Sequence, residues 1–161
     1  MIKVLFVCLG NICRSAMAQG ILEHKIKEQN LVIEVDSAGT SSHHIGDAPD
    51  KRMQAKGLEY DIDISQQQAR QFTTTDFEEF DYIFAMDSSN YNDIIRLAKS
   101  DKDKLKVSLF LNQSSPNQNK SVPDPYYGGE QGFEAVYQML DIACDAFIKN
   151  LNNNTPPTPS Y

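Results

Sequence analysis

The sequence predicts an open α/β fold, a single domain in which helices cover both faces of a parallel four-stranded sheet. The main observation is an alternation of short apolar runs, rich in β-branched and aromatic residues, with longer segments whose apolar residues recur at helical spacing. A second observation is that residues 2–35 read as strand, tight loop, helix and strand, the order of a parallel βαβ unit. At 161 residues the chain suits one core rather than two.

The first strand and the first helix are predicted with a short loop between them. Residues 2–7 (Ile-Lys-Val-Leu-Phe-Val) have the composition of a buried strand. Residues 16–29 indicate a helix, for which Ser15 is a suitable N-cap. The apolar positions with helical spacing in this segment are Met17, Ile21, Leu22 and Ile26.

The next segments are predicted to be a second strand, a long loop and a short helix. Residues 31–35 alternate with charge, as a strand does, and residues 37–50 are rich in Gly, Ser and Asp, which is typical of a loop. A helix over residues 49–56 is expected to end at Gly57, a good C-terminal cap. Residues 58–79 are mixed and polar and give no clear pattern.

Two more strands complete the predicted sheet. Residues 82–86 and 107–111 are short apolar runs that read as buried strands. Between them, residues 87–90 combine acidic, hydroxyl and amide side chains that favour a helix N-terminus, and this helix is expected to reach about Ala98. Residues 112–132 are polar and are predicted to be a loop.

A long helix is predicted to close the domain. Its apolar stripe consists of Phe133, Val136, Leu140, Ala143 and Phe147. We therefore expect a folded domain over residues 1–151, followed by a polar, Pro- and Asn-rich tail over residues 152–161.

Composition argues against several classes of function. The formal net charge of −7 disfavours nucleic-acid binding, which depends on Lys and Arg neutralising phosphates. No stretch approaches the roughly 20 apolar residues that span a membrane. The three cysteines, an odd and low number, do not suit a disulfide scaffold, so we expect a soluble cytoplasmic protein.

The segment between the first strand and the first helix, residues 8–15, is the candidate binding loop. In open α/β sheets, ligands bind beyond the carboxyl ends of strands, near a helix N-terminus. Successive backbone N–H groups, freed by Gly10 and by Asn11, which tolerates a positive φ, can converge on one anion. The helix that follows adds the positive end of its dipole, so this loop predicts a phosphate site.

Two side chains of this loop suit phosphoryl chemistry. Arg14 supplies a planar fork that matches two phosphoryl oxygens. The same positive field favours the thiolate form of Cys8, which is a strong nucleophile. Taken singly, Cys8 could be a small buried hydrophobe and Arg14 a surface residue. Their Cys-x5-Arg spacing between a strand and a helix favours a nucleophile at the bottom of an anion site.

Two motifs at opposite ends of the chain carry a family resemblance. They are Val-Cys-Leu-Gly-Asn-Ile-Cys-Arg-Ser at residues 7–15 and Asp-Pro-Tyr-Tyr-Gly at residues 124–128. Further matches lie at residues 36–41, 69–71 and 80–90. Over nearly its whole length, except the tail, the chain resembles the low-molecular-weight protein tyrosine phosphatases. The resemblance implies the fold of that family and hydrolysis of phosphotyrosine in proteins and of small aryl phosphates.

The resemblance assigns catalytic roles to three residues. Cys8 is implied to attack phosphorus and form a phosphocysteine, while Arg14 and the loop N–H groups hold the phosphate oxygens. A phenolate is a poor leaving group because the pKa of a phenol is about 10, so a general acid is needed. The family pattern assigns this acid to Asp124, which lies between Pro123 and Pro125 and later acts as the base. No cofactor and no metal are expected.

Further loop residues follow from the same resemblance. Phosphate contacts or loop support are expected from Leu9, Gly10, Asn11, Ile12, Cys13, Ser15 and Ser37. In the animal members a histidine joins the hydrogen bonds of this loop, and here Gln67 stands at that position. The family template therefore does not extend to this part of the network.

The resemblance also implies residues that contact the substrate and a second cysteine with a redox role. Tyr126 and Tyr127 resemble the aromatic wall beside the family's pocket, and His43 falls where an aromatic often forms the opposite wall. A histidine in a polar loop can equally be only solvated. Cys13 matches a thiol that forms a reversible disulfide with the nucleophile, or it packs behind the loop as a small side chain. Cys144 is expected in the core.

Three alternative functions remain open. Arsenate reductases of this fold relay oxidation through cysteines in mid-chain, and none lies between Cys13 and Cys144. Protein arginine phosphatases typically carry Thr before the second cysteine, where this chain has Ile12. A non-catalytic phosphoprotein-binding module would tolerate loss of Cys8 or Asp124, and both are present. The expected partners are tyrosine-phosphorylated proteins or peptides acted on by a monomer, without nucleic acid or membrane.

Overall fold

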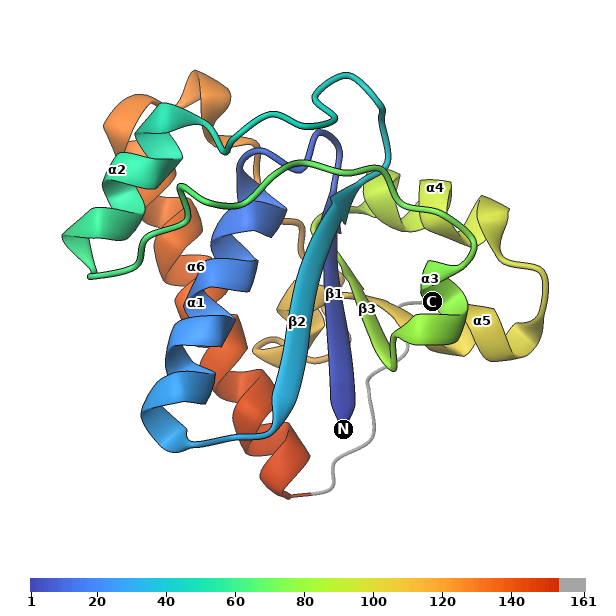
Figure 1. Cartoon of the computed structure of the whole chain (residues 1–161). Helices are drawn as coiled ribbons and strands as arrows, with labels where there is room; N and C mark the ends of the chain where they lie inside the picture. The colour runs from blue at the N-terminus through green and yellow to red at the C-terminus, as the bar shows by residue number, and fades with distance from the viewer. Residues whose placement is uncertain (154–161) are drawn as a thin grey trace.

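The protein is built on a parallel sheet of four strands in the order β2-β1-β3-β4 (Figure 1). The computed structural model describes residues 1–153, without the side chain of Tyr127. Each neighbouring pair of strands is parallel, as predicted. The strands are β1 (Ile2–Cys8), β2 (Ile33–Gly39), β3 (Tyr82–Ala85) and β4 (Val107–Leu109).

Helices cover both faces of the sheet, which confirms the predicted fold class (Figure 1). One face carries α1 (Arg14–Gln29), α2 (Lys51–Glu59) and α6 (Gly129–Asn152). The other face carries α3 (Asp76–Glu79), α4 (Ser88–Leu97) and α5 (Asp101–Leu105). Two short 3-10 helices, η1 (Phe110–Gln113) and η2 (Pro125–Tyr127), lie between β4 and α6.

The central strand β1 is buried on both sides because its side chains alternate between two cores. Val4 and Phe6 face the larger core under α1 and α6, and Leu5 and Val7 face the smaller core under α3 and α4. All four are fully buried. This explains why residues 2–7 read as an apolar run rather than as an alternating strand.

The last helix packs as its apolar stripe predicts. Each of the five stripe residues is at most 2% exposed. Phe147 stacks edge-on against Phe84 of β3, with ring centroids 5.2 Å apart, and so ties α6 to the sheet. Cys144 is fully buried in the same core, as expected.

Two predictions near the binding loop were wrong. Strand β2 does not end at Val35 but continues to Gly39, because it pairs with β1 in register up to Cys8. Ser37 therefore lies on a strand, not in a loop. Ser15 is not the N-cap of α1; Cys13 holds that position without a capping side-chain bond, and Ser15 is the second helical residue.

Other boundaries differ for local reasons. Gly57 lies inside α2, which ends at Glu59, and a Cβ at Gly57 would stand 2.6 Å from the carbonyl oxygen of Ile62. This glycine therefore permits a close backbone approach instead of capping the helix. The predicted loop over residues 112–132 holds η2 and the first turn of α6. Helix α5 was not predicted because its five residues, four charged ones and Leu105, are too few to show a helical periodicity.

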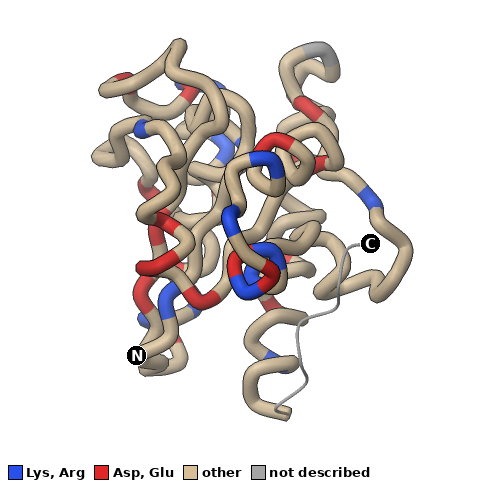
Figure 2. The backbone as a smooth tube through the Cα atoms, turned by 90° about the vertical axis from the view of Figure 1, so that its right-hand side faces the viewer, with Lys and Arg blue, Asp and Glu red and all other residues tan. Residues whose placement is uncertain are grey.

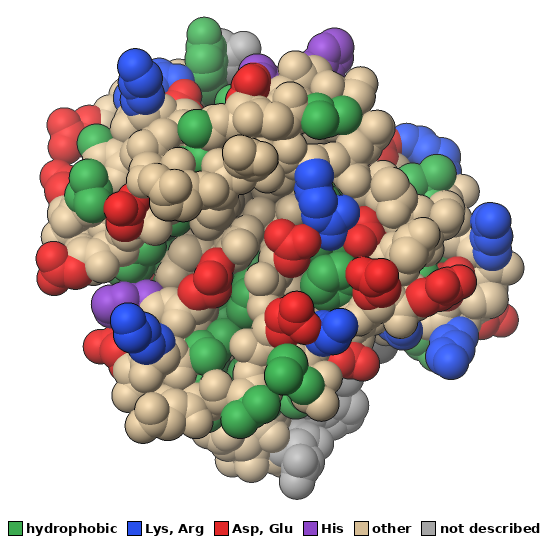
Figure 3. All heavy atoms as spheres, in the orientation of Figure 1, with side chains coloured by type: hydrophobic (Ala, Val, Ile, Leu, Met, Phe, Trp, Pro, Cys, Tyr) green, Lys and Arg blue, Asp and Glu red, His purple; other side chains and the backbone are tan. Residues whose placement is uncertain are grey.

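Charged residues of both signs are interspersed along the backbone (Figure 2), and their side chains are interspersed over the face seen in Figure 3. Within residues 1–153, none of the helices combines the length and apolarity needed to cross a membrane. Of the tail predicted over residues 152–161, Asn152 is the last residue of α6, and residues 154–161 lie outside the described part of the chain.

Candidate active site

The topology places the loop of residues 9–13 at the point where the sheet order reverses. From β1 the chain passes through α1 to β2 on one side, whereas β3 pairs with β1 on the other side. In sheets of this kind the crevice at such a switch point binds ligands. A cavity of about 470 Å³ opens there. Its lining comprises Cys8, Leu9, Gly10, Ile12, Cys13, Arg14, Ser41, His43, His44, Asp50, Arg52, Asp124, Tyr126 and Phe133.

Cys8 is the last residue of β1 and lies at the bottom of this cavity, 3% exposed. The backbone N–H of Asn11 donates to its Sγ at 3.3 Å, and the Ser15 hydroxyl lies 3.0 Å from the same atom. Both groups can stabilise negative charge on sulfur. The site therefore suits a thiolate.

The backbone of the loop offers a set of unused donors. The N–H groups that donate to no described residue belong to Leu9, Gly10, Ile12, Cys13 and Arg14. These residues also line the cavity, at the N-terminus of α1. Unpaired N–H groups at a helix N-terminus form an anion site.

Asn11, not Gly10, adopts the positive φ in the loop, at 59°. The Asn11 side chain is buried behind the cavity, where its amide donates to Ser15 Oγ at 2.8 Å and to Ser37 Oγ at 2.9 Å. Gly10 instead permits a close contact, because a Cβ there would stand 3.0 Å from the His44 ring. Asn11 thus fixes the loop in a conformation that few other residues adopt.

Gly39, at the end of β2, brings the loop close to the sheet. A Cβ at this position would stand 2.7 Å from the Leu9 carbonyl oxygen and 3.2 Å from the Asn11 nitrogen. The loop backbone therefore rests directly on the strand end. Only glycine allows this approach.

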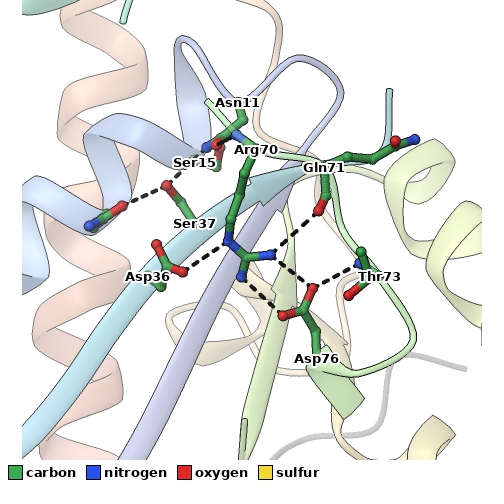
Figure 4. Close-up of polar contacts among 9 residues, drawn as sticks. Asn11, Ser15, Asp36, Ser37, Arg70, Gln71, Thr73 and Asp76 are labelled. Atoms are coloured by element: carbon green, nitrogen blue, oxygen red, sulfur yellow. Dashed lines mark hydrogen bonds and ion pairs between the residues drawn. The ribbon is translucent and has the colours of Figure 1, made fainter. Parts of the chain in front are cut away.

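The loop is also bonded to a segment far along the chain (Figure 4). The backbone N–H of Arg70 donates to Asn11 Oδ1 at 3.0 Å. The Arg70 guanidinium contacts Asp36 of β2 at 3.0 Å and the buried Asp76 of α3 at 3.0 and 3.1 Å. Gln67 takes no part in these bonds; its amide donates to the Ala16 carbonyl at 3.0 Å.

Arg14 is anchored on one edge only. Its Nη1 donates to Asp87 Oδ2 at 2.7 Å and to the Val122 carbonyl at 3.0 Å. Its Nε and Nη2 donate to none of the described residues, which leaves two donors for a ligand. Although burial lowers the pKa of Arg14, Cys8 and Asp87 raise it above the ordinary value. The guanidinium stays charged.

Asp124 is exposed and lines the cavity with Cys8. It is the N-cap of η2, where its Oδ1 accepts from the Tyr126 backbone N–H at 2.9 Å. The chain is anchored on either side, because Val122 donates to the Met86 carbonyl at 2.7 Å and Pro125 is buried. The carboxylate thus stands between two fixed points.

Aromatic and basic side chains form the upper part of the cavity. The Arg52 guanidinium lies 5.1 Å from the Tyr126 ring centre and 4.9 Å from that of Phe133. Asp50 holds Arg52 through both carboxylate oxygens, at 3.0 and 3.2 Å. The predicted His43 also lines the cavity.

The other two cysteines, Cys13 and Cys144, lie in different environments. Cys13 lines the cavity as a free thiol, and its pKa is raised by burial, by Asp50 and by Cys8. Cys13 therefore stays protonated at neutral pH. Cys144 is remote from the cavity, and burial raises its pKa well above the ordinary value. In the described part of the chain no three His, Cys, Asp or Glu side chains form a metal-binding group.

Several residues of the site were not predicted. Asp87 was considered only as a helix-starting residue, although it follows β3 at the edge where ligands bind, and that position was the available signal. Arg52, His44 and Gln19 come from other elements and carry no local pattern. The predicted residues Asn11, Ser15 and Ser37 lie behind the loop rather than in the cavity.

Comparison with known proteins gives consistent results. The family profile described as low molecular weight phosphotyrosine protein phosphatase matches residues 3–156. A Synechocystis sp. protein named for the low molecular weight protein-tyrosine-phosphatases is 44% identical over 153 residues, 92% of this chain and 96% of the relative.

Solved structures agree over similar lengths. A protein tyrosine phosphatase from Entamoeba histolytica superposes with a TM-score of 0.88 and 37% identity, covering 96% of this chain and 99% of that one. A Drosophila arginine phosphatase superposes with a TM-score of 0.86 and 34% identity, covering 93% and 98%.

Proposed function

The chain belongs to the low molecular weight phosphotyrosine protein phosphatase family, and from this premise we propose that it hydrolyses phosphotyrosine in proteins, and small aryl phosphates, through a phosphocysteine at Cys8. One observation carries the proposal. A buried cysteine, whose sulfur accepts from the Asn11 N–H and contacts the Ser15 hydroxyl, lies among unpaired N–H groups and a half-anchored arginine.

The first step transfers the phosphoryl group to the enzyme. Cys8 Sγ attacks phosphorus in line, and the bond between phosphorus and the phenolic oxygen breaks. The free N–H groups of the loop, together with Nε and Nη2 of Arg14, stabilise the equatorial oxygens. Asp124 gives its proton to the leaving oxygen.

The second step returns Cys8 to the thiolate. Asp124, now ionised, takes a proton from a water that attacks phosphorus. The S–P bond breaks, phosphate leaves, and Asp124 ends protonated. The charged Arg14 and the backbone donors supply the positive field throughout, so the scheme uses no metal and no cofactor.

Specificity for an aryl group is supported by the cavity wall. Tyr126 is 62% exposed and lines the cavity together with His43. A phenyl ring could stack between these two side chains, and Tyr127, the next residue in the sequence after Tyr126, is proposed as part of the same wall. Ile12 adds an apolar, β-branched side chain to the loop. This favours a ring over a hydrated guanidinium.

The second candidate is phosphoarginine hydrolysis, because one of the similar structures is an arginine phosphatase. A rate comparison separates the two. We expect kcat/KM to be highest on phosphotyrosine peptides, lower on small aryl phosphates and near background on phosphoarginine peptides, with Cys8→Ser inactive. Faster turnover of phosphoarginine would select the second function, and binding without turnover would indicate a non-catalytic module.

Cys13 is proposed to protect the nucleophile from irreversible oxidation. Peroxide converts the Cys8 thiolate to a sulfenic acid, and the Cys13 thiol then forms the Cys8–Cys13 disulfide with release of water. Support comes from the shared cavity and from the free state of both thiols. Mass spectrometry after mild peroxide should find this linkage, and its absence would overturn the role.

The compartment, oligomeric state and partners of the enzyme are proposed from its cysteines and its net charge. Three free cysteines suit a reducing compartment, so we place the enzyme in the cytoplasm, acting as a monomer on phosphoproteins. With a net charge of −7, neither nucleic acid nor an anionic membrane is an expected partner. Sedimentation tests whether the enzyme is a monomer, and cell fractionation tests whether it is cytoplasmic.

A further inference from the structure

The hydrogen bonds behind the loop continue outward to α1. Ser37 Oγ, which accepts from the Asn11 amide, lies 2.6 Å from Gln19 Oε1 and donates its own proton there. The Gln19 amide also lowers the pKa of Glu23, one turn further along α1, against the larger raising effect of burial. The oxygen of the Gln19 amide therefore faces Ser37 as an acceptor, the role that its nitrogen could not fill.

A second bond restrains Asn11 from the opposite side. The backbone N–H of Arg70 requires an acceptor, so it holds Oδ1 of Asn11 and excludes the flipped amide. Arg70 is itself clamped between Asp36 and Asp76 (Figure 4). The Asn11 amide nitrogen therefore has only the hydroxyls of Ser15 and Ser37 to donate to.

The direction of the last bond follows from the others. Ser15 Oγ accepts from the Asn11 amide, so its single proton is left for Cys8 Sγ, 3.0 Å away. The order of donors thus runs from Asn11 to Ser15 to the sulfur on one branch, and from Asn11 to Ser37 to Gln19 on the other.

We propose that Gln19 is a positioning residue for the nucleophile: by accepting the Ser37 proton, it keeps the Ser37 oxygen available to Asn11 and thereby commits the Ser15 proton to the Cys8 sulfur. Without this acceptor, the buried Ser37 hydroxyl would turn its proton toward the Asn11 amide N–H. Two donors would then face each other, and the bond from Asn11 to Ser37 would be lost. The inference rests on the proposed function, in which Cys8 acts as a thiolate.

The charged groups around Cys8 are left in place by changes at Gln19. They are Arg14 at the start of α1, Asp87 of the β3–α4 turn, and Asp50 and Asp124 at the cavity. The other titratable or charged side chains that line the cavity are Cys13, His43, His44 and Arg52. Gln19 does not line the cavity. An effect on the sulfur would therefore travel through Ser37, Asn11 and Ser15.

The test is the pH dependence of Cys8 alkylation by iodoacetamide, followed by mass spectrometry on the intact protein. Gln19→Leu removes the acceptor, and we expect the midpoint to rise by about one pH unit, as for a weakened hydrogen bond to a charged atom. At pH values below the midpoint, kcat/KM on an aryl phosphate should fall about tenfold. Inhibition by inorganic phosphate, measured where Cys8 is fully ionised, should stay within about twofold, because Arg14 and the loop N–H groups are untouched.

Two variants serve as controls. Gln19→Glu keeps an oxygen acceptor for Ser37 but places a second carboxylate beside Glu23, so the midpoint should lie between those of the wild type and Gln19→Leu. Gln29→Leu makes the same replacement at an exposed position of α1 and should leave the midpoint unchanged. Thermal unfolding of each variant verifies the fold, and Ser37→Ala breaks the same link at its other partner if Gln19→Leu does not fold.

A double-mutant cycle gives the decisive outcome. In a Ser15→Ala background, Gln19→Leu should produce no further shift of the midpoint. An equal shift in both backgrounds, or no shift in folded Gln19→Leu, would overturn the proposal. Alkylation needs no turnover, so a failure of the proposed function would appear separately, as wild-type protein that alkylates normally but hydrolyses no phosphate ester.

Discussion

The loop of residues 9–13 and the segment that carries Asp124 line the same cavity but are held in different ways. The loop is buried and bonded to β2, to α1 and to the segment around Arg70. Asp124 is exposed, and its side chain is held by the N–H of Tyr126, two residues away. The nucleophile side is bonded across the whole fold, whereas the acid side is bonded locally.

This difference assigns separate tasks to the two regions. A loop held by many buried bonds presents its donors to phosphate without rearranging, which is what electrostatic stabilisation requires. An acid on an exposed turn between anchors at Val122 and Pro125 can adjust to leaving groups of different shape. Loop substitutions should therefore affect stability and rate together, and changes at Asp124 should affect rate alone.

The largest effect is expected at the nucleophile. Cys8→Ser should lower kcat by about 10⁴-fold or more, because a serine hydroxyl at this site is not ionised. Phosphate binding, measured by calorimetry, should persist through Arg14 and the loop N–H groups. Substantial remaining turnover would show that Cys8 is not the nucleophile.

Asp124→Ala should lower the rate of the first step without lowering the stability of the fold. We expect the first step to slow by about 10²- to 10³-fold on phenyl phosphate, and much less on aryl phosphates with acidic leaving groups. The free energy of unfolding in urea should change by less than about 0.5 kcal/mol, because the side chain is exposed. Equal slowing for all leaving groups would contradict the role of general acid.

Asp87→Asn tests the anchor of Arg14. Asparagine can still cap α4, where Asp87 accepts from the Asn90 N–H at 2.7 Å, so the helix should persist. The ion pair with Arg14 is lost, and kcat/KM should fall about tenfold with weaker phosphate inhibition. Asp101→Asn, at an exposed position of α5, is the matched control. A variant with wild-type phosphate affinity would show that Arg14 needs no anchor.

The smallest rate effect, but the largest on stability, is expected at Ser37. Ser37→Ala removes a buried acceptor of the Asn11 amide and should lower the free energy of unfolding by about 1–3 kcal/mol. The accompanying loss of kcat/KM should be only a few-fold at a pH where Cys8 is fully ionised. Urea unfolding and steady-state rates measure both quantities. A Ser37→Ala variant with wild-type stability and a large loss of kcat/KM would contradict the conclusion that the buried bonds behind the loop mainly stabilise the fold.

Sequence reasoning succeeded where the relevant residues are close along the chain. The span from Cys8 to Arg14 lies between a strand and a helix, so both side chains come to one cavity. The stripe of α6 follows from helical spacing alone. The extension of β2 to Gly39 depends on pairing with β1, which no local pattern indicates.

The remaining site residues depend on contacts between distant segments. Asp87 reaches Arg14 across 73 positions, and Arg70 reaches Asn11 across 59. Ser15 shows the opposite case. Its sequence position suits a helix cap, but the turn of the loop directs its hydroxyl to the sulfur of Cys8. Polar residues of this kind take their partners from the tertiary fold, so propensity alone misassigns them.

The burial of β1 on both faces has a consequence for the lifetime of the reactive thiol. Backbone amides of a central strand exchange with solvent only when the sheet itself opens. Cys8 ends that strand, so fraying of the chain termini leaves its sulfur in place. In molecules that are partly unfolded at the periphery, oxidants would therefore still reach the thiol through the cavity and by no new route. Only the native cavity presents it.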